Sequence, residues 1–169
     1  KGLIVDLESV SRAVRASVSM AEKAANTRVS AVHLALSGFH TVLVPSRGKI
    51  NFDGNMKEIM PEDVSRVLKD AKSFDIPYDR QVVDVIPNQY IIDGYDEIVD
   101  PTGMMGAIVE VDADVVLGST IATQSLLKSV ERAGYQVAGI IVEALATSEV
   151  ILTSEEKELG VLQVDIGAG

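Results

Sequence analysis

Cysteine is absent from the 169 residues, so the chain offers no disulfide framework, no thiolate zinc site and no thiol nucleophile. Basic residues are few, with 15 Lys and Arg against 25 Asp and Glu, and the formal net charge is −10. This charge argues against a nucleic-acid binder, which needs clustered cations to displace counterions. It also argues against direct docking on an anionic membrane surface.

No apolar run approaches the roughly 20 residues that a membrane-spanning helix requires, and no signal peptide opens the chain. A Gly-x-x-x-x-Gly-Lys phosphate loop and a Ser/His/Asp nucleophile pattern are also missing. His33 and His40 have no partner Cys or His at metal-ligand spacing, which favours structural roles for both. The chain begins at Lys1 and stops within an Asp-Ile-Gly-Ala-Gly motif, so we expect an excerpt from a longer protein.

The residues that are present describe a globular chain, 47% hydrophobic and 24% charged. A helix is predicted from a cap at Asp6 to about Ala25. Apolar runs at 31–36 and 41–44 predict a β-hairpin, and the stretch from Arg47 to Asn55 predicts a surface loop. A helix starts at Pro61, with an apolar stripe at Val64, Val67, Leu68 and Ala71.

Further along, residues 82–92 are typical of a strand, in which Pro87 marks an edge or a bulge. Residues 100–103 form a turn signal. Met104 and Met105 follow it, and filling a core gap is favoured over a soft contact surface. Strict alternation from Val109 to Leu117 predicts a half-buried strand with its acidic residues facing the other way.

The last third alternates helix and strand. A helix capped at Ser119 or Thr120 ends near Gly134, a buried strand covers 137–142, and short helices follow at 144–152 and after Thr153. A final strand is predicted at 161–166. Residues 113–169 thus look like half of a layered α/β domain, whereas residues 31–112 form a hairpin, helix and strand module.

Two motifs could carry chemistry. Asp165, Gly167 and Gly169 follow an apolar strand in a pattern that suits phosphate binding, because glycines let backbone N–H groups approach phosphate oxygens and the aspartate can hold a hydrated cation. Taken by itself, the motif favours an ordinary turn, because Asp and Gly mark turns in general. Glu143, where a strand gives way to a helix, could orient a water near a phosphate. Spacing alone favours the other role, an acid stabilised by the helix dipole.

Several strings, in this order, resemble the FtsA family of bacterial cell-division proteins, which are actin-like ATP-binding scaffolds. The resemblance spans essentially the whole chain. The strings are residues 1–10, 34–38, 84–94, 100–106, 130–134, 152–160 and 165–169. Two positions depart from the family pattern: Ala168 stands where the family usually has glycine, and Ala144 where it usually has proline.

The resemblance implies an actin/Hsp70-like ATPase fold in which a strand–helix–strand–strand insert, subdomain 1C, covers residues 31–112. Residues 1–30 and 113–169 would be parts of subdomain 1A. The implied cofactors are ATP and Mg²⁺, with Asp165, Gly167 and Gly169 in the second phosphate loop, Asp165 as metal ligand and Glu143 positioning water. Because the first phosphate loop is absent from the chain, we expect only part of the nucleotide site.

The implied partners are further copies of the protein in a filament, FtsZ through a region outside this chain, and later division proteins through residues 31–112. The family reaches the cytoplasmic face of the inner membrane through a C-terminal helix that is not in this sequence. Two other interpretations stay open: a stand-alone protein-interaction module with no nucleotide role, and the related pilus-assembly ATPase family, which has a similar insert.

Overall fold

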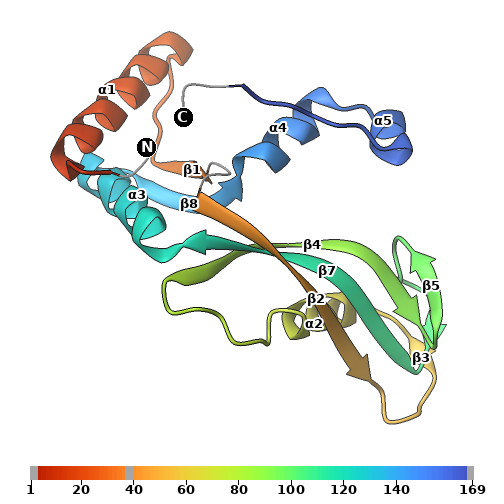
Figure 1. Cartoon of the computed structure of the whole chain (residues 1–169). Helices are drawn as coiled ribbons and strands as arrows, with labels where there is room; N and C mark the ends of the chain where they lie inside the picture. The colour runs from red at the N-terminus through yellow and green to blue at the C-terminus, as the bar shows by residue number, and fades with distance from the viewer. Residues whose placement is uncertain (1–3, 37–39, 167–169) are drawn as a thin grey trace. The chain divides into compact units, whose positions relative to one another are not determined.

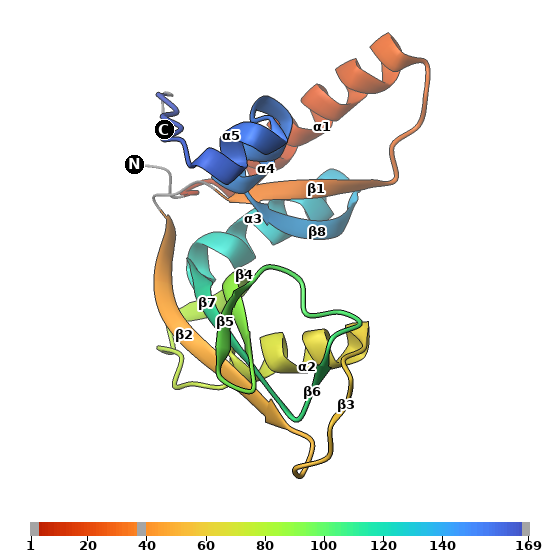
Figure 2. The same ribbon diagram turned by 90° about the vertical axis from the view of Figure 1, so that its right-hand side faces the viewer.

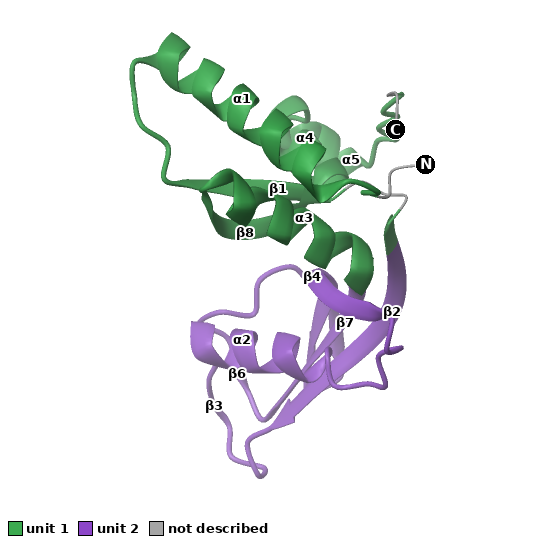
Figure 3. Ribbon diagram, turned by 90° about the vertical axis from the view of Figure 1, so that its left-hand side faces the viewer, with its two compact units in different colours: residues 1–41, 118–169 green, residues 42–117 purple. Residues whose placement is uncertain are grey.

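The computed structural model describes residues 4–36 and 40–166 (Figure 1). The chain divides into two compact units, one made of residues 1–41 and 118–169 and the other of residues 42–117 (Figure 3). We call them unit 1 and unit 2. Because unit 1 contains chain from both sides of unit 2, unit 2 is an insertion into unit 1. The prediction of a mixed α/β fold with an insert is confirmed.

Two helices of unit 1 pack against each other. Helix α1 (Leu7–Ala25) begins as predicted at Asp6, whose carboxylate accepts hydrogen bonds from the N–H groups of Glu8 and Ser9. Helix α3 (Thr120–Ala133) is capped by Ser119 and ends at Gly134 with φ +94°, also as predicted. The guanidinium of Arg15 on α1 donates to the backbone carbonyls of Ala133 and Arg132 at the end of α3, at 3.2 and 2.9 Å.

A two-stranded parallel sheet lies beside these helices. Strand β1 (Ala31–Leu36) pairs with strand β8 (Gln136–Val142), and the register shifts between Val32 and His33. The predicted hairpin between residues 31–36 and 41–44 is therefore wrong. Alternation specifies which side chains share a face but not which strand lies alongside, and here the partner comes about a hundred residues later.

Two short helices follow β8. Helix α4 (Glu143–Ile151) and helix α5 (Ser154–Leu159) match the prediction, including the capping box in which Thr153 and Glu156 bond each other's N–H groups. The final strand predicted at 161–166 is wrong, because these residues have no regular secondary structure and their apolar side chains are exposed. Among the described residues they lack a strand partner, which an extended apolar segment needs.

Unit 2 is built on a four-stranded sheet in the order β2-β7-β4-β5. Its strands are β2 (Thr41–Asn51), β4 (Arg80–Ile92), β5 (Tyr95–Ile98) and β7 (Ile108–Ser119). Residues 47–51, predicted as loop, belong to β2, because the neighbouring β7 supplies the partner that the local sequence does not reveal. β5 pairs with β4 at Tyr90 and Ile92, so Pro87 lies on an edge, as predicted.

A small antiparallel ribbon and one helix complete unit 2 (Figure 2). Strand β3 (Lys57–Glu58) pairs with β6 (Met105–Gly106), and helix α2 (Pro61–Asp70) follows β3. The predicted stripe of α2 packs on the sheet, so α2, the ribbon and the sheet share one core. Its buried members are Ile50, Ile59, Val67, Ala71, Tyr90, Ile92, Val109, Val111 and Ala113.

The limits of unit 2 differ from the limits expected for the insert. The sequence predicted an insert of residues 31–112, whereas the compact unit runs from Val42 to Leu117. The difference arises at both ends from strand pairing. β1 pairs with β8 and so lies in unit 1, and β7 stays within the sheet of unit 2 beyond residue 112. Within residues 4–36 and 40–166, no helix combines the length and the apolar character that crossing a membrane requires.

Candidate functional site

The two charged residues predicted to serve a nucleotide are both exposed. Glu143 is the first residue of α4, directly after β8, and its backbone carbonyl accepts a hydrogen bond from the Thr147 hydroxyl at 3.0 Å. Asp165 lies in the irregular segment after α5. Gly167 and Gly169 fall outside the described residues. The roles of all four remain predictions; of the two described residues, Glu143 and Asp165, no hydrogen bond or ion pair joins one to the other.

Metal-binding geometry is also missing from the part of the chain that the structure describes. No group of three or more His, Asp or Glu side chains there is placed to hold a metal ion. Asp165, the predicted magnesium ligand, therefore belongs to no such group among the described residues.

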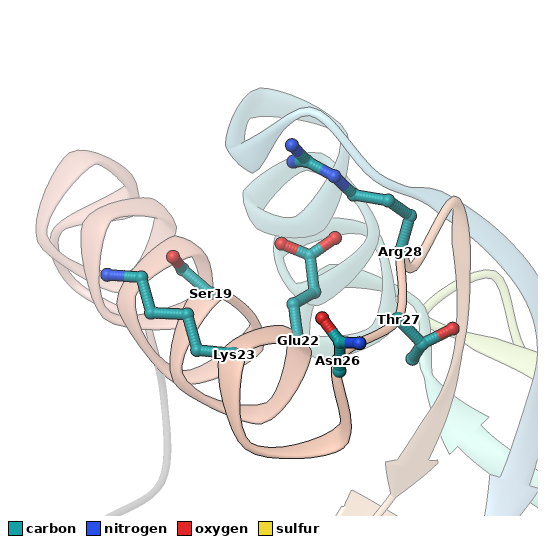
Figure 4. Close-up of a pocket in the computed structure, with 6 residues that line it drawn as sticks. All are labelled: Ser19, Glu22, Lys23, Asn26, Thr27 and Arg28. Carbon is teal, nitrogen blue, oxygen red and sulfur yellow. The ribbon is translucent and has the colours of Figure 1, made fainter.

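A surface pocket of about 570 Å³ lies at the end of α1 (Figure 4). It contains two cations, Lys23 and Arg28, but Figure 4 shows that their charged groups do not converge on one point. The acid beside them, Glu22, is already engaged, because its carboxylate accepts the N–H of Val29 at 2.9 Å. Neither Glu143 nor Asp165 lines this pocket, so it does not assemble the predicted nucleotide residues.

A polar network covers the sheet face of unit 2 that points away from its core. Arg47 on β2 donates two hydrogen bonds to the carboxylate of Asp112 on β7, at 2.6 and 3.0 Å, and Gln89 on β4 donates a third at 2.9 Å. The hydrogen bond from Arg47 is the largest cause that lowers the pKa of Asp112 below its usual value, and the hydrogen bond from Gln89 is the next largest. These side chains hydrogen-bond one another across three strands, so the network stabilises the sheet.

This network was only partly predictable. The alternation in β7 correctly placed Glu110, Asp112 and Asp114 on the face opposite the core. Their cations, Arg47 and Lys49, were assigned to a loop, so the ion pairs with Asp112 and with Glu110 at 3.1 Å were missed. The signal was present in the apolar and polar alternation of β2, which Gly48 and Pro45 obscured.

A group of exposed methionines is the other unpredicted feature of unit 2. Met104 and Met105 were expected to fill a core gap, and this prediction is wrong, because their side chains are 41% and 56% exposed. Met56 and Met60 lie on the same ribbon and are 65% and 47% exposed. Four of the five methionines therefore lie in or beside this ribbon with exposed side chains, where a flexible, polarisable side chain suits contact with another molecule.

Comparison with known proteins agrees with the two-unit organisation. Residues 38–117 match the family described as the SHS2 domain inserted in FtsA. The whole chain is 34% identical over 169 residues to the cell division protein FtsA of Borreliella burgdorferi, and 36% identical over 169 residues to FtsA of Bacillus subtilis. FtsA of Escherichia coli K12 is also 36% identical over 169 residues.

In each case the match covers all of this chain but 41%, 38% and 40% of the respective relative. The chain thus spans about two fifths of the length of these relatives. Among solved structures, one titled "PilM-PilN type IV pilus biogenesis complex" aligns with a TM-score of 0.49 at 18% identity, over 88% of this chain and 38% of that one.

Proposed function

The chain belongs to the FtsA family of bacterial cell-division proteins, with residues 38–117 as its SHS2 domain, and we propose that it is part of an actin-like scaffold for cell division. The observation that carries the proposal is the continuous similarity to FtsA across the insert and both flanking segments. In the longer protein, the scaffold binds ATP and Mg²⁺, polymerises, anchors FtsZ filaments to the inner membrane and recruits later division proteins.

Within this proposal, residues 31–112 provide the assembly surface. Unit 2 supports this role because it buries its own core and leaves strand edges open. β2 lies at one end of the four-stranded sheet, and β5 covers β4 only at Tyr90 and Ile92. Open edges present unpaired backbone groups, which invite pairing with another chain.

The nucleotide role belongs to the flanking segments. Asp165 would hold the magnesium ion, Gly167 and Gly169 would contact phosphate through their N–H groups, and Glu143 would position water. Support for these roles comes from the family resemblance, because the described residues alone do not form a nucleotide pocket. FtsZ binding and membrane attachment would come from regions outside this chain, at the cytoplasmic face of the inner membrane.

A second candidate is a stand-alone interaction module without a nucleotide role. It is favoured by one observation: the core of unit 2 consists of residues between Ile50 and Ala113 and draws on no residue of unit 1. An assay that separates ATP binding from assembly therefore distinguishes the two candidates.

The test uses the longer protein that contains this sequence. Replacing residues 42–117 with a short Gly/Ser linker should leave ATP affinity near normal and abolish or reshape filaments, as measured by calorimetry and electron microscopy. Glu143→Ala should slow ATP hydrolysis and spare ATP binding, because it removes an interaction made mainly in the transition state.

Glu149→Ala is the matched control for Glu143→Ala, since Glu149 is an exposed acid on the same helix. Normal filaments from the linker variant would contradict the assembly role of the insert. Lack of ATP binding by the intact longer protein would contradict the nucleotide role and favour the interaction module.

A further inference from the structure

The ribbon of β3 and β6 has an inner and an outer face. Glu58 lies opposite Met105 and Lys57 opposite Gly106. The pairing continues through hydrogen bonds from the N–H of Ile59 to Met104 and from the N–H of Gly103 to Ile59, both 2.8 Å. Side chains alternate along each strand, so residues 57, 59, 104 and 106 share one face, and residues 56, 58, 60 and 105 share the other.

The inner face is packed firmly. Ile59 is fully buried in the core, and a Cβ on Gly106 would lie 2.5 Å from Ile92, so the ribbon backbone is pressed against β4. The Lys57 ammonium lies 2.8 Å from the Asp63 carboxylate and 4.3 Å from the centre of the Phe52 ring. The ribbon therefore forms a rigid support, and the cation of β3 is already paired.

The outer face is apolar and open. Met56, Met60 and Met105, which we call the methionine face, are 65%, 47% and 56% exposed. Methionine side chains adapt their shape to a partner and contact aromatic and aliphatic groups well. The alternation places these three side chains on one face of the ribbon, as a contact surface requires.

The charge around the methionine face is negative. Glu58 lies on the same outer face, and Glu62 follows Met60 in the first turn of α2; both are exposed. Unit 2 as a whole contains 15 acidic and 7 basic residues between positions 42 and 117, a net charge of −8. A second methionine face, an anionic bilayer or a nucleic acid would be repelled here, whereas a cationic partner would be attracted.

We propose that the methionine face docks a cationic amphipathic segment of a partner protein. Its apolar side chains contact Met56, Met60 and Met105, and its Lys or Arg side chains pair with Glu58 and Glu62. Amphipathic helices bind methionine-rich acidic surfaces in this way, with the apolar stripe supplying affinity and the flanking charges orientation. The inference deepens the proposed recruiting role of residues 31–112 and rests on it.

The test uses the 169-residue chain with ¹³C-labelled methionine methyl groups and a synthetic 18-residue helix of Leu and Lys. On titration with this Leu/Lys helix, the signals of Met56, Met60 and Met105 should shift, and that of Met20 should not. Met20 is a matched control because it is 70% exposed on α1, in unit 1. The double variant Met60→Ser, Met105→Ser should weaken binding roughly tenfold or more, and Glu58→Lys should weaken it as well.

Several outcomes would overturn the proposal. They are equal shifts at Met20, equal binding of a Leu/Glu helix, unchanged affinity in the double variant, or concentration-dependent shifts without peptide, which would indicate a second copy on this face. The assay needs neither ATP nor filaments. If the Leu/Lys helix does not bind the methionine face but the longer protein forms normal filaments, the docking proposal is wrong and the scaffold proposal is unaffected.

Discussion

Gly48 lies where strand β2 passes closest to helix α2. A Cβ at this position would be 2.2 Å from the carbonyl oxygen of Val67 and 2.8 Å from the N–H nitrogen of Ala71, both backbone atoms that cannot move aside cheaply. We expect Gly48→Ala to destabilise unit 2 by about 1–3 kcal/mol, because α2 must shift away from the sheet. Urea unfolding followed by circular dichroism measures the loss.

The control for Gly48→Ala is Gly54→Asn. Gly54 has φ +75°, a conformation that asparagine adopts more readily than most other residues, and a Cβ added there would meet no other atom within 4 Å. The Gly54 variant should lose clearly less stability than Gly48→Ala, because its cost is the positive φ alone and no backbone atom is in the way. Equal stability of both variants would show that β2 and α2 are not in the close contact described above.

The acidic start of α2 joins this helix to the ribbon. The Asp63 carboxylate is almost fully buried, accepts the N–H of Met60 at 3.1 Å and lies 2.8 Å from Lys57 and 3.2 Å from Arg66. The hydrogen bond with Lys57 is the largest cause that lowers the pKa of Asp63 below its usual 3.8. One side chain thus accepts the N–H of the residue that precedes α2 and neutralises the inward-facing cation of β3.

We expect Asp63→Asn to lower the free energy of unfolding by about 2 kcal/mol at neutral pH, because it leaves Lys57 without its buried counter-charge. The pKa of Asp63 is lower in the folded than in the unfolded chain. Its stabilising contribution is therefore present above about pH 4 and is lost as the pH falls through the folded pKa.

Denaturant melts of both proteins between pH 2 and pH 7 measure this dependence. The difference between the parent chain and Asp63→Asn should shrink below about pH 4. Glu62→Gln removes the neighbouring exposed acid and should change stability little at any pH. A difference that stays constant down to pH 2 would rule out the ion pair as its source.

The two compact units differ in how self-sufficient they are. Unit 2 covers its sheet with α2 and the β3–β6 ribbon, and its core residues all come from its own segment. Unit 1 has a parallel sheet of two strands, and Val161, Leu162, Val164 and Ile166 are exposed beside no strand partner among the described residues. Parallel sheets are normally covered on both faces, so unit 1 is the part that further chain would stabilise.

We therefore predict that residues 40–119, expressed alone, fold cooperatively. A core of this size supports a stability of about 3–5 kcal/mol. Thermal and urea unfolding, each followed by far-UV and near-UV circular dichroism, should give coincident single transitions. Gly48→Ala should lower the midpoint of urea unfolding in the isolated unit, as we also expect in the 169-residue chain. A broad or absent transition would mean that unit 2 depends on unit 1.

Local chemistry was enough to predict the helices and the buried face of β7. Asp6, Pro61 and Ser119 mark helix starts through side-chain caps or a preset φ, and the apolar spacing that follows each specifies the buried stripe. These signals act over a few residues, so they can be recognised without knowing the fold. The whole-length resemblance identified the family for the same reason, because it consists of short strings in a fixed order.

Strand partners and exposed surfaces were decided by the tertiary structure. β1 lies beside β8 rather than β2, and the 161–166 segment stays unpaired, because pairing depends on which edges the rest of the fold brings near. Met56, Met60 and Met105 became a surface only once β3 met β6 across almost fifty residues of chain. The alternation of a strand shows which of its side chains share a face. Whether that face is exposed to water or buried in a core depends on how the rest of the chain packs against the strand.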